Sequence, residues 1–186
     1  MENNYQLVPE KWIDNYADAL YAFCFVRVNN HNLAEDLVQE TFLSAWKARE
    51  KYNATATEKN WLYAICKNKI IDQYRKNKSH LVLEETEETE TYFDNENHWK
   101  SEKQPKDWGL NGQTNLEQKE FYQILSKCKL KLKELQQQVF VLKYIDEIES
   151  EQICKILGIS TSNYWVLIHR SKLQLRNCLE KNWLKI

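Results

Sequence analysis

The sequence predicts an all-α protein built from two small helical domains that are joined by a flexible acidic linker. Glycine and proline occur only 3 and 2 times among 186 residues, which argues against a turn-rich β fold. Apolar residues recur at helical spacing over most of the N-terminal part, lose that spacing over residues 81–115, and regain it from Phe121 onward. We therefore expect a first domain over residues 1–80, a linker over residues 81–115 and a second domain over residues 116–186.

Charge is segregated along the chain, although its net value is only −1. Lysine and arginine cluster near the end of the first domain and at the end of the second, and a run of carboxylates fills residues 84–96 between them. Basic clusters of this kind are typical of nucleic-acid-binding surfaces. The linker also contains aromatic residues, Trp99 and Trp108 among them, so we expect part of it to dock on a partner.

The composition argues against several classes of protein. No run of about 18 apolar residues is present and the first residues are polar, so we expect no membrane insertion, no signal peptide and a cytoplasmic location. The cysteines are scattered without a CxxC pair, and the four histidines lie far apart. The sequence therefore predicts no metal site, no cofactor and no catalytic constellation, so we do not expect an enzyme. We interpret all five cysteines as reduced, small hydrophobic residues: Cys24, Cys66, Cys128, Cys154 and Cys178.

Near the C-terminus, the segment IDEIESEQICKILGISTSNYWVLIHRSKLQLR has the layout of a helix-turn-helix. Gly158 can adopt the positive φ that ends the first helix, and Ser160 or Thr161 can cap the second. The second helix has an apolar face, and we expect its opposite face to enter the major groove of DNA. A basic surface helix without a DNA partner is the alternative interpretation. The face predicted to contact DNA carries Trp165, His169, Lys172 and Arg176.

In the first domain, the segment AEDLVQETFLSAWKA predicts an amphipathic helix whose polar face binds a partner helix. That face is acidic and yet includes an apolar residue, Leu43. An ordinary solvated face with one leucine is an equally good interpretation of the periodicity alone. The predicted docking residues are Asp36, Gln39, Glu40 and Leu43, and the predicted apolar stripe is Ala34, Leu37, Val38, Thr41, Phe42, Ala45 and Trp46.

The segment WLYAICKNKIIDQYRKNK predicts a helix that binds single-stranded nucleic acid. Its inward residues are Leu62, Ile65, Cys66 and Ile70. The other side interleaves aromatic rings with cations, and rings stack on unpaired bases at about 1 to 3 kcal/mol each while cations follow the phosphates. The alternative, that the tyrosines complete the core, stays open for Tyr63. The nucleic-acid side comprises Tyr63, Lys67, Ile71, Tyr74 and Lys78, with Asn68 and Arg75 beside it.

These segments carry a family resemblance. AEDLVQETFLSAW and WLYAICKNKIIDQYRK resemble region 2 of the extracytoplasmic-function (ECF) group of sigma-70-type RNA polymerase sigma factors, and ICKILGISTSNYWVLIHRSKLQLR resembles region 4. The resemblance implies a polymerase specificity subunit without catalytic residues of its own, which directs promoter recognition, −10 melting and transcription initiation. It implies as partners promoter DNA, core RNA polymerase through the clamp coiled coil of the largest subunit and the flap, and an anti-sigma factor. The linker would thread through the polymerase cleft.

The resemblance also implies roles for single residues. Asp36, Gln39 and Glu40 would meet the clamp coiled coil, and residues 53–60 would capture a base flipped from the −10 element. Pattern and resemblance together give two sets of DNA-binding residues. The −10 set is Asn53, Thr55, Asn60, Lys67, Asn68, Tyr74 and Arg75, and the −35 set is Thr161, Ser162, Trp165, Val166, His169, Arg170, Lys172 and Arg176.

Some positions depart from the family pattern. Trp165 and Val166 stand where many relatives carry polar or basic residues, so the −35 preference of those relatives does not transfer. Glu58 stands in the expected base-capture loop where an aromatic residue is common, and Lys131 and Lys133 occur where relatives often have proline.

Two other functions fit the sequence less well. A dimeric DNA-binding regulator would need a dimer coil or a ligand pocket, because one helix-turn-helix reads only a half-site, and the sequence suggests neither. An enzyme that acts on nucleic acid would need clustered carboxylates or a nucleophile with its base. The only dense carboxylates lie in residues 84–96, where the helical pattern is lost.

Overall fold

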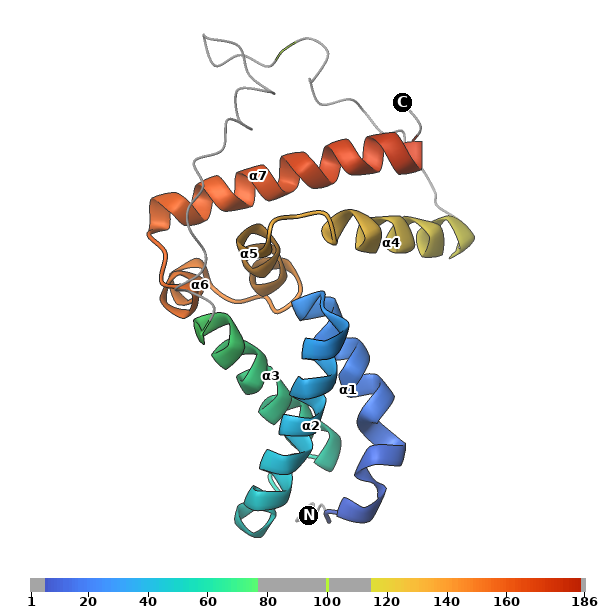
Figure 1. Ribbon diagram of the computed structural model, residues 1–186, viewed down its shortest axis with the longest axis vertical. Coiled ribbons are helices and arrows are strands. Elements are labelled where there is room, and N and C mark those ends of the chain that lie inside the picture. The colour runs from blue at the N-terminus through green and yellow to red at the C-terminus, as the bar shows by residue number, and fades with distance from the viewer. Residues whose placement is uncertain (1–5, 77–99, 101–114, 185–186) are drawn as a thin grey trace. The chain divides into compact units, whose positions relative to one another are not determined.

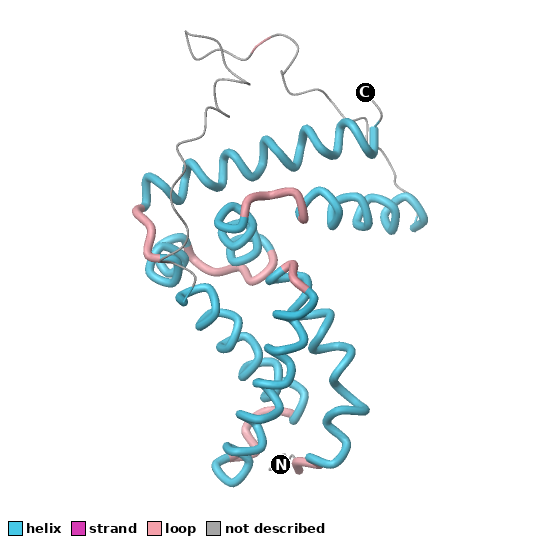
Figure 2. The backbone as a smooth tube through the Cα atoms, viewed as in Figure 1, coloured by secondary structure: helices cyan, strands magenta, loops and turns pink. Residues whose placement is uncertain are grey.

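The computed structural model describes residues 6–76, Lys100 and residues 115–184, and in that part of the chain it contains helices and turns but no strand (Figure 1; Figure 2). The predicted all-α fold is confirmed. The predicted linker lies outside the described residues except for Lys100 and Asn115. The chain divides into two compact units, Met1–Lys78 and Ser79–Ile186. Of the helices described, none combines the length and the apolar character needed to cross a bilayer.

The first unit contains three long helices, α1 (Trp12–Val28), α2 (His31–Ala48) and α3 (Glu58–Lys76), preceded by a short turn at Pro9–Lys11. Two asparagines make the reversal between α1 and α2. Asn29 ends α1 in the left-handed conformation with φ 53°, which asparagine tolerates better than most residues. The Asn30 side chain accepts a hydrogen bond of 3.0 Å from the Leu33 backbone N–H and so caps α2. The connection is therefore short, and α1 packs directly against α2.

The apolar stripe predicted for α2 is confirmed except at its last position. The side chains from Ala34 to Ala45 in that stripe are buried or half-buried, and the Thr41 hydroxyl donates to the Leu37 carbonyl at 2.7 Å. The assignment of Trp46 to the core is wrong, because its side chain is 49% exposed and the Arg49 guanidinium lies 4.0 Å from its ring centroid. On α3 the predicted inward residues Leu62, Cys66 and Ile70 are buried, and Ile65 is half-buried.

Glu58, the first residue of α3, ties the N-terminal segment to the rest of the first unit. Its Oε1 accepts hydrogen bonds of 2.6 Å from the Val8 backbone N–H and from the Trp12 indole, and its Oε2 accepts one of 3.1 Å from the Tyr16 hydroxyl. Burial and this hydrogen bond raise the pKa of Tyr16 above its ordinary value, so its hydroxyl stays a protonated donor at neutral pH. Glu58 therefore joins α1 and α3 where the resemblance led us to expect an aromatic residue.

The second unit is built around one long helix. α4 (Asn115–Lys129), α5 (Glu134–Tyr144) and α6 (Ser150–Leu157) all contact α7 (Thr161–Leu179), which continues into a π-helical turn at Glu180–Leu184. The buried residues of the second unit include Leu135, Val139, Leu142, Ile153, Ile156, Leu157, Tyr164, Leu167, Ile168, Leu173 and Leu175.

The turn between α6 and α7 has the predicted helix-turn-helix chemistry. Gly158 ends α6 in the left-handed conformation at φ 64°, and the Ser160 hydroxyl accepts a hydrogen bond of 3.2 Å from the Asn163 backbone N–H. A residue with a Cβ would be strained at Gly158, and Ser160 satisfies one of the unpaired amides at the start of α7. The predicted layout of this motif is confirmed.

The prediction that all five cysteines are reduced is wrong for one pair. Cys128 of α4 and Cys178 of α7 form a disulfide, although 50 positions separate them in sequence. The other three cysteines are free. In the core of the first unit the Sγ atoms of Cys24 and Cys66 lie 3.2 Å apart, and this contact together with burial raises the pKa of Cys24, which keeps that thiol protonated.

Candidate polymerase and nucleic-acid interfaces

The four residues predicted to dock on a partner lie together on the solvent-facing side of α2. Asp36, Gln39, Glu40 and Leu43 are all exposed, and Leu43 is 54% exposed although it is apolar. They recur at spacings of three and four residues, which places them on one side of the helix. We call these four residues the docking face. An exposed leucine surrounded by acidic and amide groups suits a partner helix with a basic, partly apolar surface.

Two neighbours modify the docking face. Trp46 lies three residues after Leu43 and is half exposed, so it extends the apolar part of this surface. The spacing of three residues between Leu43 and Trp46 is visible in the sequence and places both on one side of the helix, but the aromatic side chain of Trp46 suggested burial. Glu40 contributes less free charge than expected, because its Oε2 lies 3.5 Å from Lys69 Nζ on α3.

A structured loop leads into α3. Asn53 Oδ1 accepts a hydrogen bond of 2.8 Å from the Thr55 hydroxyl and a longer one of 3.4 Å from its backbone N–H, and Ala54 between them has a positive φ of 56°. The Thr57 hydroxyl then accepts from the Asn60 backbone N–H at 3.2 Å and caps α3. The Asn53 and Thr55 side chains are both exposed. This loop is therefore held in shape by its own polar groups, and α3 begins within the range expected to form the loop, which places Asn60 in the first helical turn.

The exposed side of α3 carries some, but not all, of the predicted nucleic-acid residues. Asn60 and Asn68 are exposed, Lys67 is half-buried, and Arg75 is exposed with its Nη1 3.2 Å from the Asp72 carboxylate. Tyr63, whose role the sequence left open, is half-buried with its ring edge against Phe23 at 5.0 Å between ring centroids. Tyr63 therefore packs partly into the first unit.

The prediction that the Tyr74 ring lies on this exposed side is wrong. Tyr74 is 2% exposed, and its hydroxyl donates a hydrogen bond of 2.8 Å to the Arg27 carbonyl at the end of α1. The reason is geometric: the buried row of α3 runs through every fourth residue from Leu62 to Ile70, and Tyr74 is the next member of that row. We therefore remove Tyr74 from the candidate −10 residues.

The predicted −35 residues lie on the recognition helix α7, and their side chains differ in exposure. Trp165 is 59% exposed and Val166 is 41% exposed, and His169 and Lys172 are also exposed. Lys172 Nζ lies 5.4 Å from the Tyr144 ring centroid, which positions the ammonium group at the edge of this surface. The set has three further members. Thr161 and Ser162 are exposed in the first turn of α7, and Arg170 is half-buried.

Arg176 does not fit the expectation of a phosphate-contacting cation. Its Nε lies 2.9 Å from Glu180 Oε1, one helical turn further on, and both side chains are less than one fifth exposed. A paired and mostly buried guanidinium gains little from a phosphate that would have to displace its carboxylate. We therefore assign Arg176 to the closing turn of the second unit, and Lys172 becomes the leading candidate for a phosphate contact.

The chain matches the family model for sigma-70 region 2 over residues 12–80 and the model for sigma-70 region 4 over residues 122–175. It is 38% identical over 167 residues to a probable RNA polymerase sigma factor of Haemophilus influenzae, covering 87% of this chain and 84% of the relative. It is 31% identical over 170 residues to the ECF RNA polymerase sigma factor SigW of Bacillus subtilis, covering 90% and 86%.

Among solved structures, the sigma factor RpoE of Bartonella quintana, crystallised with the anti-sigma factor NepR, is similar with 21% identity and a TM-score of 0.44, covering 93% of this chain and 97% of that chain. The two family models match this chain in the order region 2, region 4, and the two relatives align with 87% and 90% of it. The chain therefore belongs to the sigma-70 family of RNA polymerase sigma factors, as a member of the ECF type.

Proposed function

We propose that this chain divides promoter recognition between its two units: the first docks on core RNA polymerase and opens the −10 element, and the second reads the −35 element. The observation that carries this proposal is the placement of the docking face and the α3 surface on different helices of the first unit, combined with an exposed recognition helix in the second. The protein then acts in the cytoplasm with core polymerase and promoter DNA as partners, and contributes no catalytic residue. Binding of an anti-sigma factor is a further expectation, which follows from the resemblance.

The chemistry of each surface suits its proposed task. Only unpaired bases offer faces for stacking and edges for capture, and the structured loop presents Asn53 and Thr55 toward solvent at the start of α3. A helix in the major groove reads base edges near its beginning, where Trp165 and Val166 are exposed. The proposal is tested by run-off transcription with purified core polymerase, which should start at a defined promoter only when this chain is added.

We expect charge reversal on the docking face to weaken binding to core polymerase without unfolding the protein. Asp36→Lys should raise the dissociation constant at least about tenfold, because it places a like charge against a basic partner helix. The free energy of unfolding should change by less than about 0.5 kcal/mol, since Asp36 is exposed. Asp36 is preferred to Glu40 because reversal of Glu40 would also repel Lys69. The matched control is Asp18→Lys on α1, also exposed, and equal affinities of both variants would remove α2 from the interface.

We expect two substitutions on α7 to affect DNA binding in different ways. Lys172→Ala should weaken binding to all −35 sequences alike and reduce the slope of log affinity against log salt by about 1, as loss of one phosphate contact does. Trp165→Ala should instead change which −35 sequence is preferred, since a good base contact contributes about 1 to 3 kcal/mol. Selection from a randomised −35 library at two salt concentrations measures both effects. A Trp165→Ala protein that selects the unchanged sequence would contradict the base-reading role.

A further inference from the structure

We propose that Cys128 and Cys178 form a reversible thiol–disulfide site which exchanges with an anionic low-molecular-weight thiol, and which thereby fastens α4 to the recognition helix α7 or releases it. This proposal goes beyond promoter recognition. It rests on the proposed cytoplasmic role in one respect, which is that we expect the bond to be reduced and re-formed there. Disulfides in that reducing compartment are usually transient and redox-sensing rather than structural.

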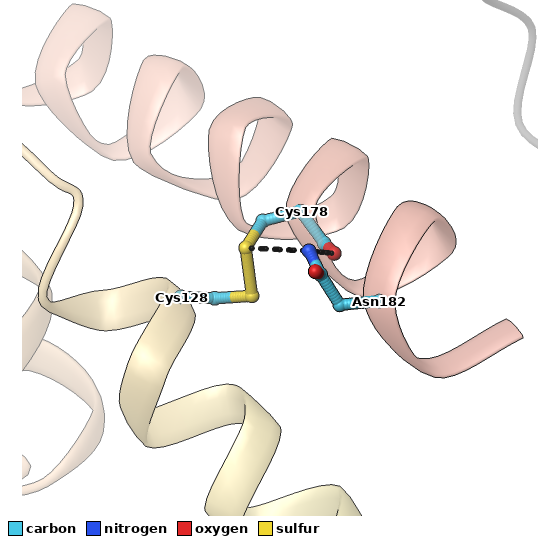
Figure 3. The surroundings of a disulfide bond; sticks show 3 residues. All are labelled: Cys128, Cys178 and Asn182. Atoms are coloured by element: carbon cyan, nitrogen blue, oxygen red, sulfur yellow. Dashed lines mark hydrogen bonds between the residues drawn. A yellow bond between two sulfur atoms is a disulfide. The ribbon is translucent and has the colours of Figure 1, made fainter. Parts of the chain in front are cut away.

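The two cysteines occupy equivalent places in their helices. Cys128 lies in the last turn of α4 and Cys178 in the last turn of α7, and their Cα atoms are 5.7 Å apart (Figure 3). This separation lies within the range of about 4.4 to 6.8 Å that a disulfide spans without backbone movement. The bond therefore needs no displacement of either helix from its place in this structure.

The bond is a large part of what holds α4 in place. Among the α4 side chains that the structure describes, residues 119–129, only Cys128 and Lys129 are buried. The apolar contacts of α4 come mainly from half-buried residues, which pack against a small buried cluster formed by the ends of α4 and α7 and by the turn between α4 and α5. That cluster consists of Cys128, Leu132, Leu175 and Leu179, with Phe121, Ile124, Leu125, Phe140 and Cys178 packed against it. A helix with so shallow a contact depends on its covalent tether.

The disulfide is accessible through a pocket whose chemistry selects the exchanging thiol. Both cysteines line a pocket of about 250 Å³, and Lys131 and Lys181 line it as well. None of the lining residues that the structure describes is acidic, and the remaining polar ones, such as Asn177, are amides. Two ammonium groups and several amides suit a small thiol that bears carboxylates and peptide groups, of which glutathione is the experimental probe.

The geometry also indicates which sulfur reacts first. Cys178 is half-buried whereas Cys128 is 2% exposed, so the incoming thiolate reaches the Cys178 sulfur. The Asn182 side-chain amide donates to the Cys178 carbonyl at 2.7 Å and lies 3.5 Å from Cys178 Sγ (Figure 3). This N–H group can stabilise negative charge on that sulfur when it later leaves as a thiolate.

The exchange balances in two steps. The first thiolate bonds to Cys178 Sγ and breaks the disulfide, and Cys128 leaves as a thiolate that takes up a proton. A second thiolate then attacks the sulfur of the bound small thiol, which releases Cys178 as a thiolate together with the oxidised small-molecule disulfide. Two small thiols are oxidised while one protein disulfide is reduced to two thiols, and the reverse reaction restores the bond.

The test uses the oxidised full-length chain and three thiols that differ in charge: glutathione, neutral 2-mercaptoethanol and cationic cysteamine. Mass spectrometry after thiol labelling follows the loss of the Cys128–Cys178 bond. Lys131→Gln combined with Lys181→Gln should slow reduction by glutathione about tenfold at low ionic strength, slow 2-mercaptoethanol less and change cysteamine least, because the ammonium groups attract the attacking thiolates in the order of their net negative charge. Equal effects on all three thiols, or reduction only by a protein reductase, would overturn the proposal.

Hydrogen exchange on the same samples tests the consequence for α4. Reduction should accelerate exchange of the α4 amides at least about tenfold and leave those of α1 to α3 unchanged, since the free cysteines of the first unit are not altered. Cys128→Ser with Cys178→Ser should reproduce the reduced state under all conditions, whereas Cys154→Ser should behave as the parent chain. Identical exchange in the oxidised and reduced chains would show that the bond does not fasten α4. None of these readouts involves transcription, so their failure is distinct from failure of the proposed function.

Discussion

Replacement of Glu58 by alanine should lower the free energy of unfolding of the first unit by about 2 to 4 kcal/mol. The carboxylate accepts three hydrogen bonds, from the Val8 backbone, the Trp12 indole and the Tyr16 hydroxyl. Hydrogen bonds to charged groups contribute about 1.5 to 3 kcal/mol each, and the Trp12 and Tyr16 donors left behind are partly buried and would lack a partner. The three contributions share one acceptor, so they do not add fully.

Urea unfolding followed by hydrogen exchange in α1 measures this loss, because exchange resolves the first unit from the second. Glu58→Gln keeps one acceptor oxygen and should fall between the parent and the alanine variant. Glu35→Ala is the matched control, since Glu35 is exposed on α2 and should change the stability by less than about 0.5 kcal/mol. If Glu58→Ala were as stable as Glu35→Ala, the carboxylate would not organise the N-terminal segment.

The sequence predicted those features that depend on local physics. Helix ends follow from single residues, so Gly158 and Ser160 identified the turn before the recognition helix. The buried stripe of α2 follows from periodicity over several turns, and most of it was assigned correctly. The docking face is the complement of that stripe, which is why its four residues were found to be exposed.

Two of the wrong predictions concern residues whose placement depends on contacts with residues far away in the sequence. Tyr74 was assigned to the exposed side of α3, but its partner, the Arg27 carbonyl, lies 47 positions away in sequence. The Cys128–Cys178 bond likewise joins residues that only the packing of α4 on α7 brings together. Arg176 is different, because Glu180 lies four residues later and the pairing could have been read from the sequence. The role of Glu58 required the structure, whereas the spacing of Trp46 from Leu43 was visible in the sequence and only its aromatic side chain suggested burial.

Substitutions in the structured loop and on α3 should impair promoter opening on duplex DNA and lose most of that defect on a pre-melted promoter. Asn68→Ala and Thr55→Ala each remove an exposed polar group that we propose contacts an unpaired −10 base. A neutral hydrogen bond contributes about 0.5 to 1.5 kcal/mol, so open complexes on duplex should fall roughly 2- to 13-fold. A promoter with a pre-formed −10 bubble already has its bases unpaired, so on it the loss should be smaller. Permanganate footprinting measures unpaired thymines on the duplex template, and run-off transcription compares both templates, because the thymines of the pre-formed bubble react whether or not the protein is bound.

The comparison between the two templates separates melting from recognition. Asn15→Ala, exposed on α1, should behave as the parent chain on both templates and controls for the loss of an asparagine side chain. Trp165→Ala should be defective on both templates, because a bubble at −10 does not change the −35 major groove that α7 is proposed to read. If the bubble rescued Trp165→Ala as fully as Asn68→Ala, the two units would not act at separate steps. A Thr55→Ala defect of equal size on both templates would instead make the loop a contributor to overall affinity, and the hydrogen bond between Asn53 and Thr55 would then matter for loop shape rather than for capture of a base.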